Sequence, residues 1–168
     1  FDNYCGTEPI TISRSSFYNG EEFVTLTYEG LESVTVAAGQ SVVSDEVKVA
    51  VAAGSTSFVS FYLGEFTQMR SAVYTSGPLT KGLYAVGDYT YEKEISITVS
   101  RGTNICYFLS NVSVYTSTEN RTIVCYGDSI TAQDWPDYLN LRLKEEGYTH
   151  TAVIRRATSG SRILREYD

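Results

Sequence analysis

From Phe1 to about Thr118, the chain consists of short runs in which apolar residues alternate with polar ones. A period of two residues places one face of a strand inside and the other face outside. Glycine- and proline-containing stretches such as Gly77-Pro78 separate the runs, as is typical of turns. The pattern predicts a β-sandwich domain of the jelly-roll type over residues 1–118. The expected strands include the runs 10–12, 34–36, 47–51, 58–63, 95–99 and 105–115.

Residues 117–120 are polar, and the pattern changes after them. A strand is expected at 121–126, and its unbroken apolar run at 123–126 is typical of a strand in the interior of a parallel sheet. Apolar residues at 135, 139 and 143 then predict a helix, with Asp134 as its N-cap and Gly147 just past its end. A second strand is expected at 151–154, and a second helix from Arg162 to Tyr167. We therefore expect a domain boundary near Thr118 and the beginning of an α/β domain over 119–168.

A candidate nucleophile stands at the end of the first of these strands. The strand breaks at Gly127 into a turn that contains Asp128, Ser129 and Thr131. Ligands bind outside the carboxyl ends of the strands in open α/β sheets, so a serine hydroxyl there is well placed for nucleophilic attack. The alternative is a plain tight turn, in which Gly127 supplies a positive φ and Ser129 only caps a backbone N–H group.

Two motifs give this chain a family resemblance. Gly127-Asp128-Ser129-Ile130-Thr131 resembles the first motif of the SGNH, or GDSL, family of serine ester hydrolases. After the second apolar run, Arg155-Arg156-Ala157-Thr158-Ser159-Gly160-Ser161-Arg162 resembles the family's second block, about 30 residues downstream as in a βαβ unit. The resemblance implies a three-layer α/β fold with Ser129 as the nucleophile. The backbone N–H groups of Ser129 and Gly160 would donate to the oxyanion, and no cofactor or metal is needed.

The other catalytic blocks of the family do not occur in this sequence. There is no G-x-N-D pattern to supply an oxyanion asparagine, and no D-x-x-H pattern to supply the catalytic aspartate and histidine. His150 is the only histidine, and it lies between the two motifs instead of far beyond the second one. We expect an ordinary strand-end histidine there. The chain therefore looks truncated: we expect the rest of the site on a missing segment or on a second chain that completes the α/β domain.

Composition narrows the remaining classes of function. The net charge is −7, from 20 acidic and 13 basic residues, which argues against a nucleic-acid surface. No apolar run approaches the length needed to cross a membrane. Three cysteines form no disulfide framework, and Cys125 is expected to be a small buried core residue. Cys5 and Cys106 are candidates for pairing if the protein is exported. Secretion or display on a bacterial surface fits the sequence without being fixed by it.

Most of the 14 tyrosines lie within residues 1–118. Tyrosine suits half-buried strands, and the alternative is a sugar-binding face on which pyranose rings stack. This region also resembles the β domain that precedes the catalytic domain in a group of bacterial GDSL-type acylhydrolases. Together the resemblances imply a serine ester hydrolase for acetyl or other short acyl esters, including glycan-linked ones. Two alternatives remain: a β module that binds glycan or protein, and an inactive piece of a two-chain assembly.

Overall fold

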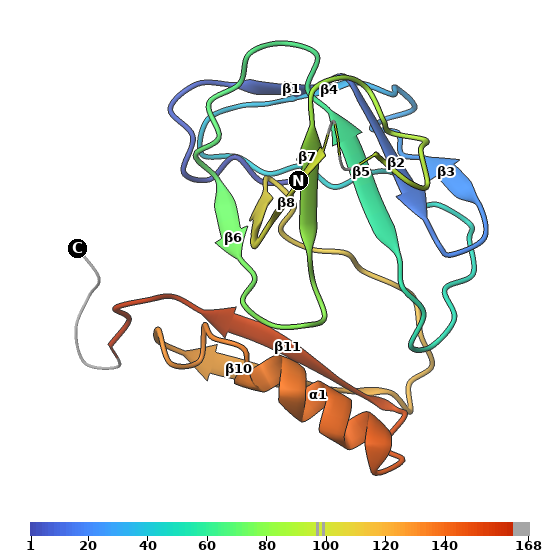
Figure 1. The fold of residues 1–168 in the computed structure, drawn as a ribbon, viewed down its shortest axis with the longest axis vertical. Helices are drawn as coiled ribbons and strands as arrows, with labels where there is room; N and C mark the ends of the chain where they lie inside the picture. Colours follow the sequence, from blue (N-terminus) through green and yellow to red (C-terminus); the bar gives the residue numbers. More distant parts are fainter. Residues whose placement is uncertain (97, 99, 163–168) are drawn as a thin grey trace. The chain divides into compact units, whose positions relative to one another are not determined.

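The computed structural model describes residues 1–96, 98 and 100–162, and in them the chain is mostly β with one short helix (Figure 1). Helix α1 (Trp135–Glu145) lies between the last two strands in the sequence. The strands are β1 (Ile10–Ile12), β2 (Arg14–Tyr18), β3 (Phe23–Thr25), β4 (Val34–Val36), β5 (Phe58–Tyr62), β6 (Ala72–Tyr74), β7 (Gly82–Ala85), β8 (Ser100–Thr103), β9 (Ile105–Tyr107), β10 (Arg121–Gly127) and β11 (Thr151–Ala157).

The strands form small separate sheets. The largest sheet of the described residues has three strands in the order β3-β2-β5, and the pairs β1-β4, β6-β9, β7-β8 and β10-β11 form the others. The predicted β-rich character of the first part is confirmed, in sheets smaller than those of the expected sandwich. A three-layer α/β domain is not evident in the part of the chain that the structure describes. Contacts group the chain into unit 1 (1–73 and 83–112) and unit 2 (74–82 and 113–168).

The core of unit 1 is built from the inward residues of its short strands. Ile10 pairs with Val36 across the antiparallel β1-β4 ladder, and both side chains are at most 3% exposed. Phe108 packs against this pair and is 2% exposed. Its φ of 58° lies in the left-handed region, which costs a non-glycine residue about 1 kcal/mol. Backbone bonds with Ser71 and Asp2 hold it there, so the strand expected at 105–115 ends at residue 107.

The β3-β2-β5 sheet presents two different faces because successive residues of β2 point to opposite sides. Ser15 and Phe17 are buried on one face, where the Ser15 hydroxyl bonds the Tyr28 hydroxyl at 2.8 Å. Phe61, the partner of Ser15 in the ladder, packs against the core on this side. The opposite face carries Arg14, Ser16 and Tyr18, which we call the outer row of β2.

One of the strands expected from alternation is absent from the structure, and another falls partly on residues that the structure does not describe. Residues 47–50 alternate between half-buried and exposed, Val51 is exposed, and the stretch forms no strand. The Asn19 side chain donates to the carbonyl of Ala50 at 2.9 Å, but no ladder includes these residues. The alternation therefore occurs without strand pairing. The run 95–99 contains residues 97 and 99, which lie outside the described residues.

Unit 2 contains the predicted strand–helix–strand order. β10 and β11 pair in parallel over seven residues each, and α1 contacts β11. Asp134 occupies the N-cap position as predicted, although its side chain makes no capping bond. The helix ends in a Schellman motif: Gly147 has φ 87°, its N–H bonds the carbonyl of Lys144, and the N–H of Tyr148 bonds that of Leu143. The second predicted helix falls largely on residues 163–168, outside the described residues.

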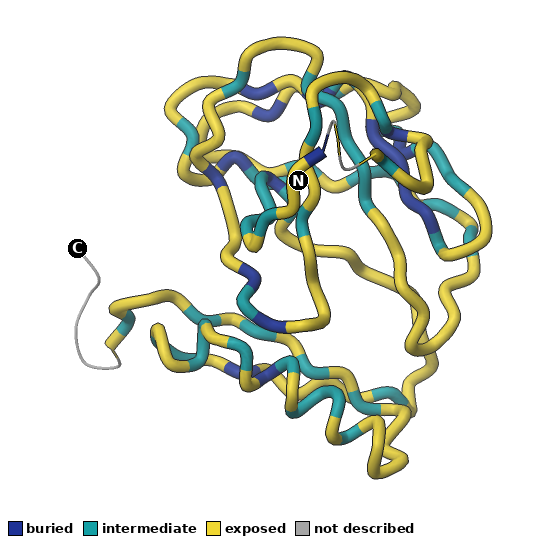
Figure 2. Tube along the Cα trace, in the orientation of Figure 1, coloured by how far each residue is buried: buried dark blue, intermediate teal, exposed yellow. Residues whose placement is uncertain are grey.

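A strand is present at 121–126 as predicted, but the prediction that it is buried in the interior of a sheet is wrong. Cys125, 6% exposed, is the one buried residue of β10, whereas Val124 is 52% and Tyr126 is 82% exposed. Ile154, opposite Val124 in the ladder, is 39% exposed. Figure 2 shows the same exposure along β10. Parallel strands are normally covered on both faces, and the face that contains Val124 and Ile154 is open in the described residues. In this part of the chain no helix has the length and apolar composition of a membrane span.

Candidate functional site

The carboxyl ends of β10 and β11 bring the two sequence motifs to the same edge of one sheet. Gly127, the last residue of β10, is the register partner of Ala157, the last residue of β11. Just beyond them, the N–H of Thr158 donates to the carbonyl of Gly127 at 3.0 Å. The turn that begins at Asp128 and the turn that begins at Thr158 therefore leave the sheet side by side, which is the position where parallel sheets bind ligands.

The first turn is shaped by Asp128. Its Oδ1 accepts the N–H of Ile130 at 3.0 Å, and its carbonyl accepts the N–H of Ala132 at 2.9 Å. Gly127 is required by a close approach: a Cβ at this position would lie 2.4 Å from Oγ1 of Thr131. The carboxylate of Asp128 thus shapes the turn, and Ser129 stands exposed at its tip.

The second turn holds Gly160 in a conformation that favours glycine. Gly160 has φ 84°, and the turn is closed by a bond of 3.1 Å from the N–H of Ser161 to the carbonyl of Thr158. Neither the amide of Ser129 nor that of Gly160 donates a hydrogen bond to any described residue. An oxyanion hole needs two such donors that face a common point.

The structure places His150 at the opposite end of the strands. Its Nδ1 lies 2.9 Å from Oδ1 of Asn120, and its carbonyl accepts the N–H of Arg121 at the amino end of β10. Seven strand residues span about 20 Å, so the imidazole is far beyond hydrogen-bonding reach of Ser129. The expectation of a strand-end histidine agrees with this position, and neither turn contains a histidine.

An open cleft of about 280 Å³ lies at this amino end of the strands. Residues 147–151 line it together with Glu119 and Arg121. His150 and Gly147 were considered from the sequence for other roles, and the remaining lining residues were not; the signal for a cleft was that two polar stretches precede neighbouring parallel strands. Because the cleft lies at the other end of β10 and β11 from Ser129, it has no part in the chemistry of the two turns.

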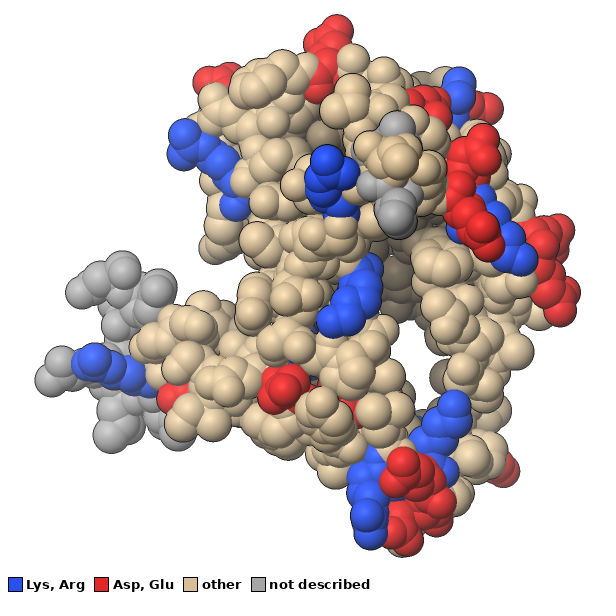
Figure 3. Space-filling view, in the orientation of Figure 1, with Lys and Arg blue, Asp and Glu red and all other residues tan. Residues whose placement is uncertain are grey.

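No group of three or more metal-ligating side chains forms among the residues that the structure describes. In the view of Figure 3, basic side chains stand singly or beside acidic ones and do not gather into one patch.

The cysteines differ in their exposure. Cys125 is buried in β10, as predicted. Cys5 is an exposed thiol in this structure, so the disulfide considered between Cys5 and Cys106 is not formed.

No protein-family model matches this chain, and no curated protein matches it. The functional assignment of the two turns accordingly rests on their own residues and geometry.

Proposed function

We propose that this chain contains the nucleophile-bearing part of a serine ester hydrolase of the SGNH, or GDSL, type. The observation that supports the proposal best is the pairing of two turns at the carboxyl ends of adjacent parallel strands. One turn presents the exposed hydroxyl of Ser129, and the amides of Ser129 and Gly160 are left without partners among the described residues. An acyl-transfer site needs these features at one place.

In this proposal, Oγ of Ser129 attacks the acyl carbon of the ester, and the N–H groups of Ser129 and Gly160 donate to the developing oxyanion. A general base must take the hydroxyl proton and return it to the leaving alcohol. His150 cannot do this from the amino end of the strands. We therefore assign the base and its orienting carboxylate to residues outside this chain, on a further segment or on a second chain.

The proposal extends to fold and substrate. Unit 1 would belong to a jelly-roll-like β domain, and unit 2 would be the opening βαβ unit of a three-layer hydrolase fold. We propose acetyl or other short acyl esters, glycan-linked ones among them, as substrates of a secreted or surface protein. Support for a glycan comes from the exposed rings of Phe58 (47%) and Tyr91 (41%), because aromatic faces stack against sugars.

A binding module is the second candidate, favoured by the same aromatic residues. Tyr18 lies between Phe23 and Phe58, with ring centroids 4.6 and 5.8 Å away, and Tyr91 meets Phe23 edge-on at 6.1 Å. Such a group of rings on a sheet is suited to binding a glycan without any chemistry.

A hydrolysis assay with 4-nitrophenyl acetate and the natural protein distinguishes between the two proposed functions. Ser129→Ala should lower kcat by about a thousandfold or more while the circular dichroism and melting temperature stay unchanged. The matched control is Ser161→Ala, since Ser161 joins its turn through its backbone and should lose its side chain at little cost. An unchanged rate in Ser129→Ala would overturn the hydrolase proposal and favour the binding module.

A further inference from the structure

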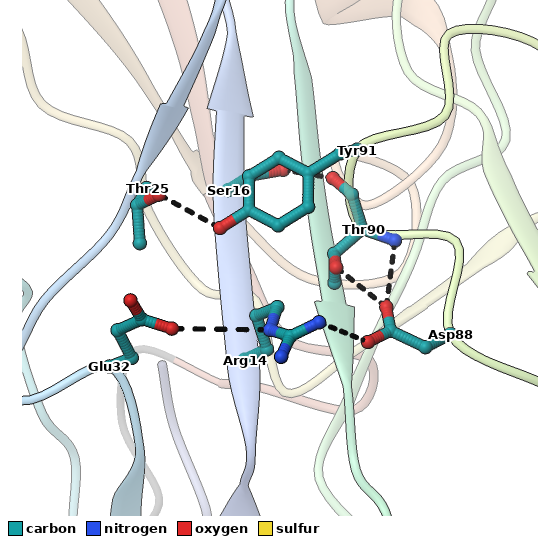
Figure 4. Close-up of polar contacts among 7 residues, drawn as sticks. All are labelled: Arg14, Ser16, Thr25, Glu32, Asp88, Thr90 and Tyr91. Atoms are coloured by element: carbon teal, nitrogen blue, oxygen red, sulfur yellow. Dashed lines mark hydrogen bonds and ion pairs between the residues drawn. The ribbon is translucent and has the colours of Figure 1, made fainter.

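Residues 88–93 run across the outer face of the β3-β2-β5 sheet without forming a strand (Figure 4). We call this segment the strap. Its residues meet the outer row of β2 in order along the chain. Asp88 pairs with the guanidinium of Arg14 at 2.8 Å, and the carbonyl of Thr90 accepts the hydroxyl of Ser16.

The far end of the strap continues the same alignment. The amine of Lys93 lies 5.6 Å from the centroid of the Tyr18 ring, at the end of the outer row. Between these points, the Tyr91 hydroxyl lies 2.8 Å from Oγ1 of Thr25 on the neighbouring strand β3. The strap therefore covers the sheet along the whole length of β2.

All of these contacts depend on side chains. Within the strap, the N–H of Glu92 bonds the carbonyl of Tyr89 at 3.1 Å, and the N–H of Thr90 bonds Oδ1 of Asp88 at 3.0 Å. No backbone–backbone bond joins residues 88–93 to the described part of the sheet. By contrast, β2 itself is held by ladders to β3 and β5 on both sides.

This difference implies that strap and sheet have different local stabilities. Partly exposed ion pairs and single hydroxyl contacts each contribute little, whereas a strand with ladders on both edges opens only with its sheet. The strap nevertheless hides buried groups: Ser16 is 0%, Thr90 is 2% and Tyr18 is 3% exposed. Opening it would uncover a row of hydroxyl groups beside aromatic rings.

We propose that the strap opens as one unit while the sheet below it stays folded, and that Asp88 is the residue that holds it shut. Asp88 is central because its carboxylate joins both parts. One oxygen bonds Arg14 on the sheet, and the other accepts the amide and the hydroxyl of Thr90 within the strap. Glu32 also approaches Arg14, but only at 4.0 Å, and its side chain is 61% exposed.

Hydrogen–deuterium exchange of the chain, read by mass spectrometry, tests the proposal. In the unmodified chain, amides of residues 88–93 should exchange faster than those of β2 in the same sample. Asp88→Asn should speed exchange in the strap by about twofold to fivefold and leave β2 unchanged. The control is Glu32→Gln, which changes a charge beside the same arginine and should leave the strap as it was.

Equal exchange rates for the strap and β2 would overturn the proposal, because the strap would then open only when the sheet unfolds. The same holds if Asp88→Asn leaves strap exchange unchanged. If Asp88→Asn does not fold, Thr25→Val replaces it, since this change removes only the Tyr91 contact. Faster strap exchange with β2 protected in that variant supports a separate opening, and faster exchange in both contradicts it.

Discussion

At the scale of single residues, the candidate site depends on backbone amides more than on side chains. Gly160 is the clearest case, since it combines a φ of 84° with an N–H group that donates to none of the described residues. Ser129 combines an exposed hydroxyl with an amide that likewise has no partner in the described part of the chain. The sequence predicted a turn at each strand end, and both turns are present; the catalytic roles of Ser129 and Gly160 stay predictions.

A substitution of Gly160 tests whether its backbone N–H group stabilises the oxyanion. On the proposed mechanism, Gly160→Ala in the natural protein should lower kcat by about tenfold to a hundredfold, because a side chain disfavours the left-handed φ that aims the N–H group. The affinity for the ester in the ground state should change less. Steady-state kinetics measure both quantities, and a kcat equal to that of the unmodified enzyme would remove Gly160 from the oxyanion hole.

A second prediction at this scale concerns pH. Burial raises the pKa of Asp88, but hydrogen bonds from Thr90 and the charge and hydrogen bond of Arg14 outweigh it and hold this pKa below the ordinary value of 3.8. A carboxylate with a lowered pKa in the folded state stabilises the fold above its ordinary pKa, and this contribution is lost as the pH falls through the lowered value. Asp88→Asn should therefore cost about 0.5–1 kcal/mol at pH 7 and less than this near pH 2. Urea titrations at both pH values measure the difference; a cost that is the same at both would contradict the assignment.

At the scale of elements, the sequence predicts whether a segment forms a strand or a helix better than it predicts how far that segment is buried. The order strand, helix, strand over 121–157 and the glycine just past the end of α1 follow from local signals, which act within a turn of chain. The exposure of Val124 in β10 does not follow from them, because burial depends on what covers a strand. Residues 47–51 show the same limit: their sequence alternates, but a ladder needs a neighbour in register.

The helix end gives a prediction of its own. Gly147→Ala should destabilise unit 2 by about 1 kcal/mol, because the Schellman motif requires a left-handed residue there and a Cβ would gain no contact within 4 Å. Gly102→Ala is the control, since Gly102 also has open space around a Cβ but no positive φ. Thermal or urea unfolding compares the two. Equal effects in both variants would argue against the left-handed cap as the cause.

At the scale of the whole molecule, the two units differ in how well they cover their apolar residues. Unit 1 buries Ile10, Val36 and Phe108 in a common core, whereas the open sheet face of unit 2 exposes Val124 and Ile154. Residues 1–168 expressed alone should therefore be cut by trypsin within 119–168 before unit 1 is cut, and should not hydrolyse 4-nitrophenyl acetate. Mass spectrometry of a digestion time course reports the order. Equal resistance of both parts, or measurable hydrolysis, would contradict this account.

The central claim is that Ser129 is an acyl-accepting nucleophile, and a covalent label tests it most directly. A fluorophosphonate reacts with serines that are activated by a base and an oxyanion hole, and it leaves a phosphonyl group on the nucleophile. Tandem mass spectrometry of the natural protein after labelling should find the group on Ser129, and on no other serine of this chain. Loss of esterase activity with the label on a different residue, or no labelling of an active protein, would contradict the claim.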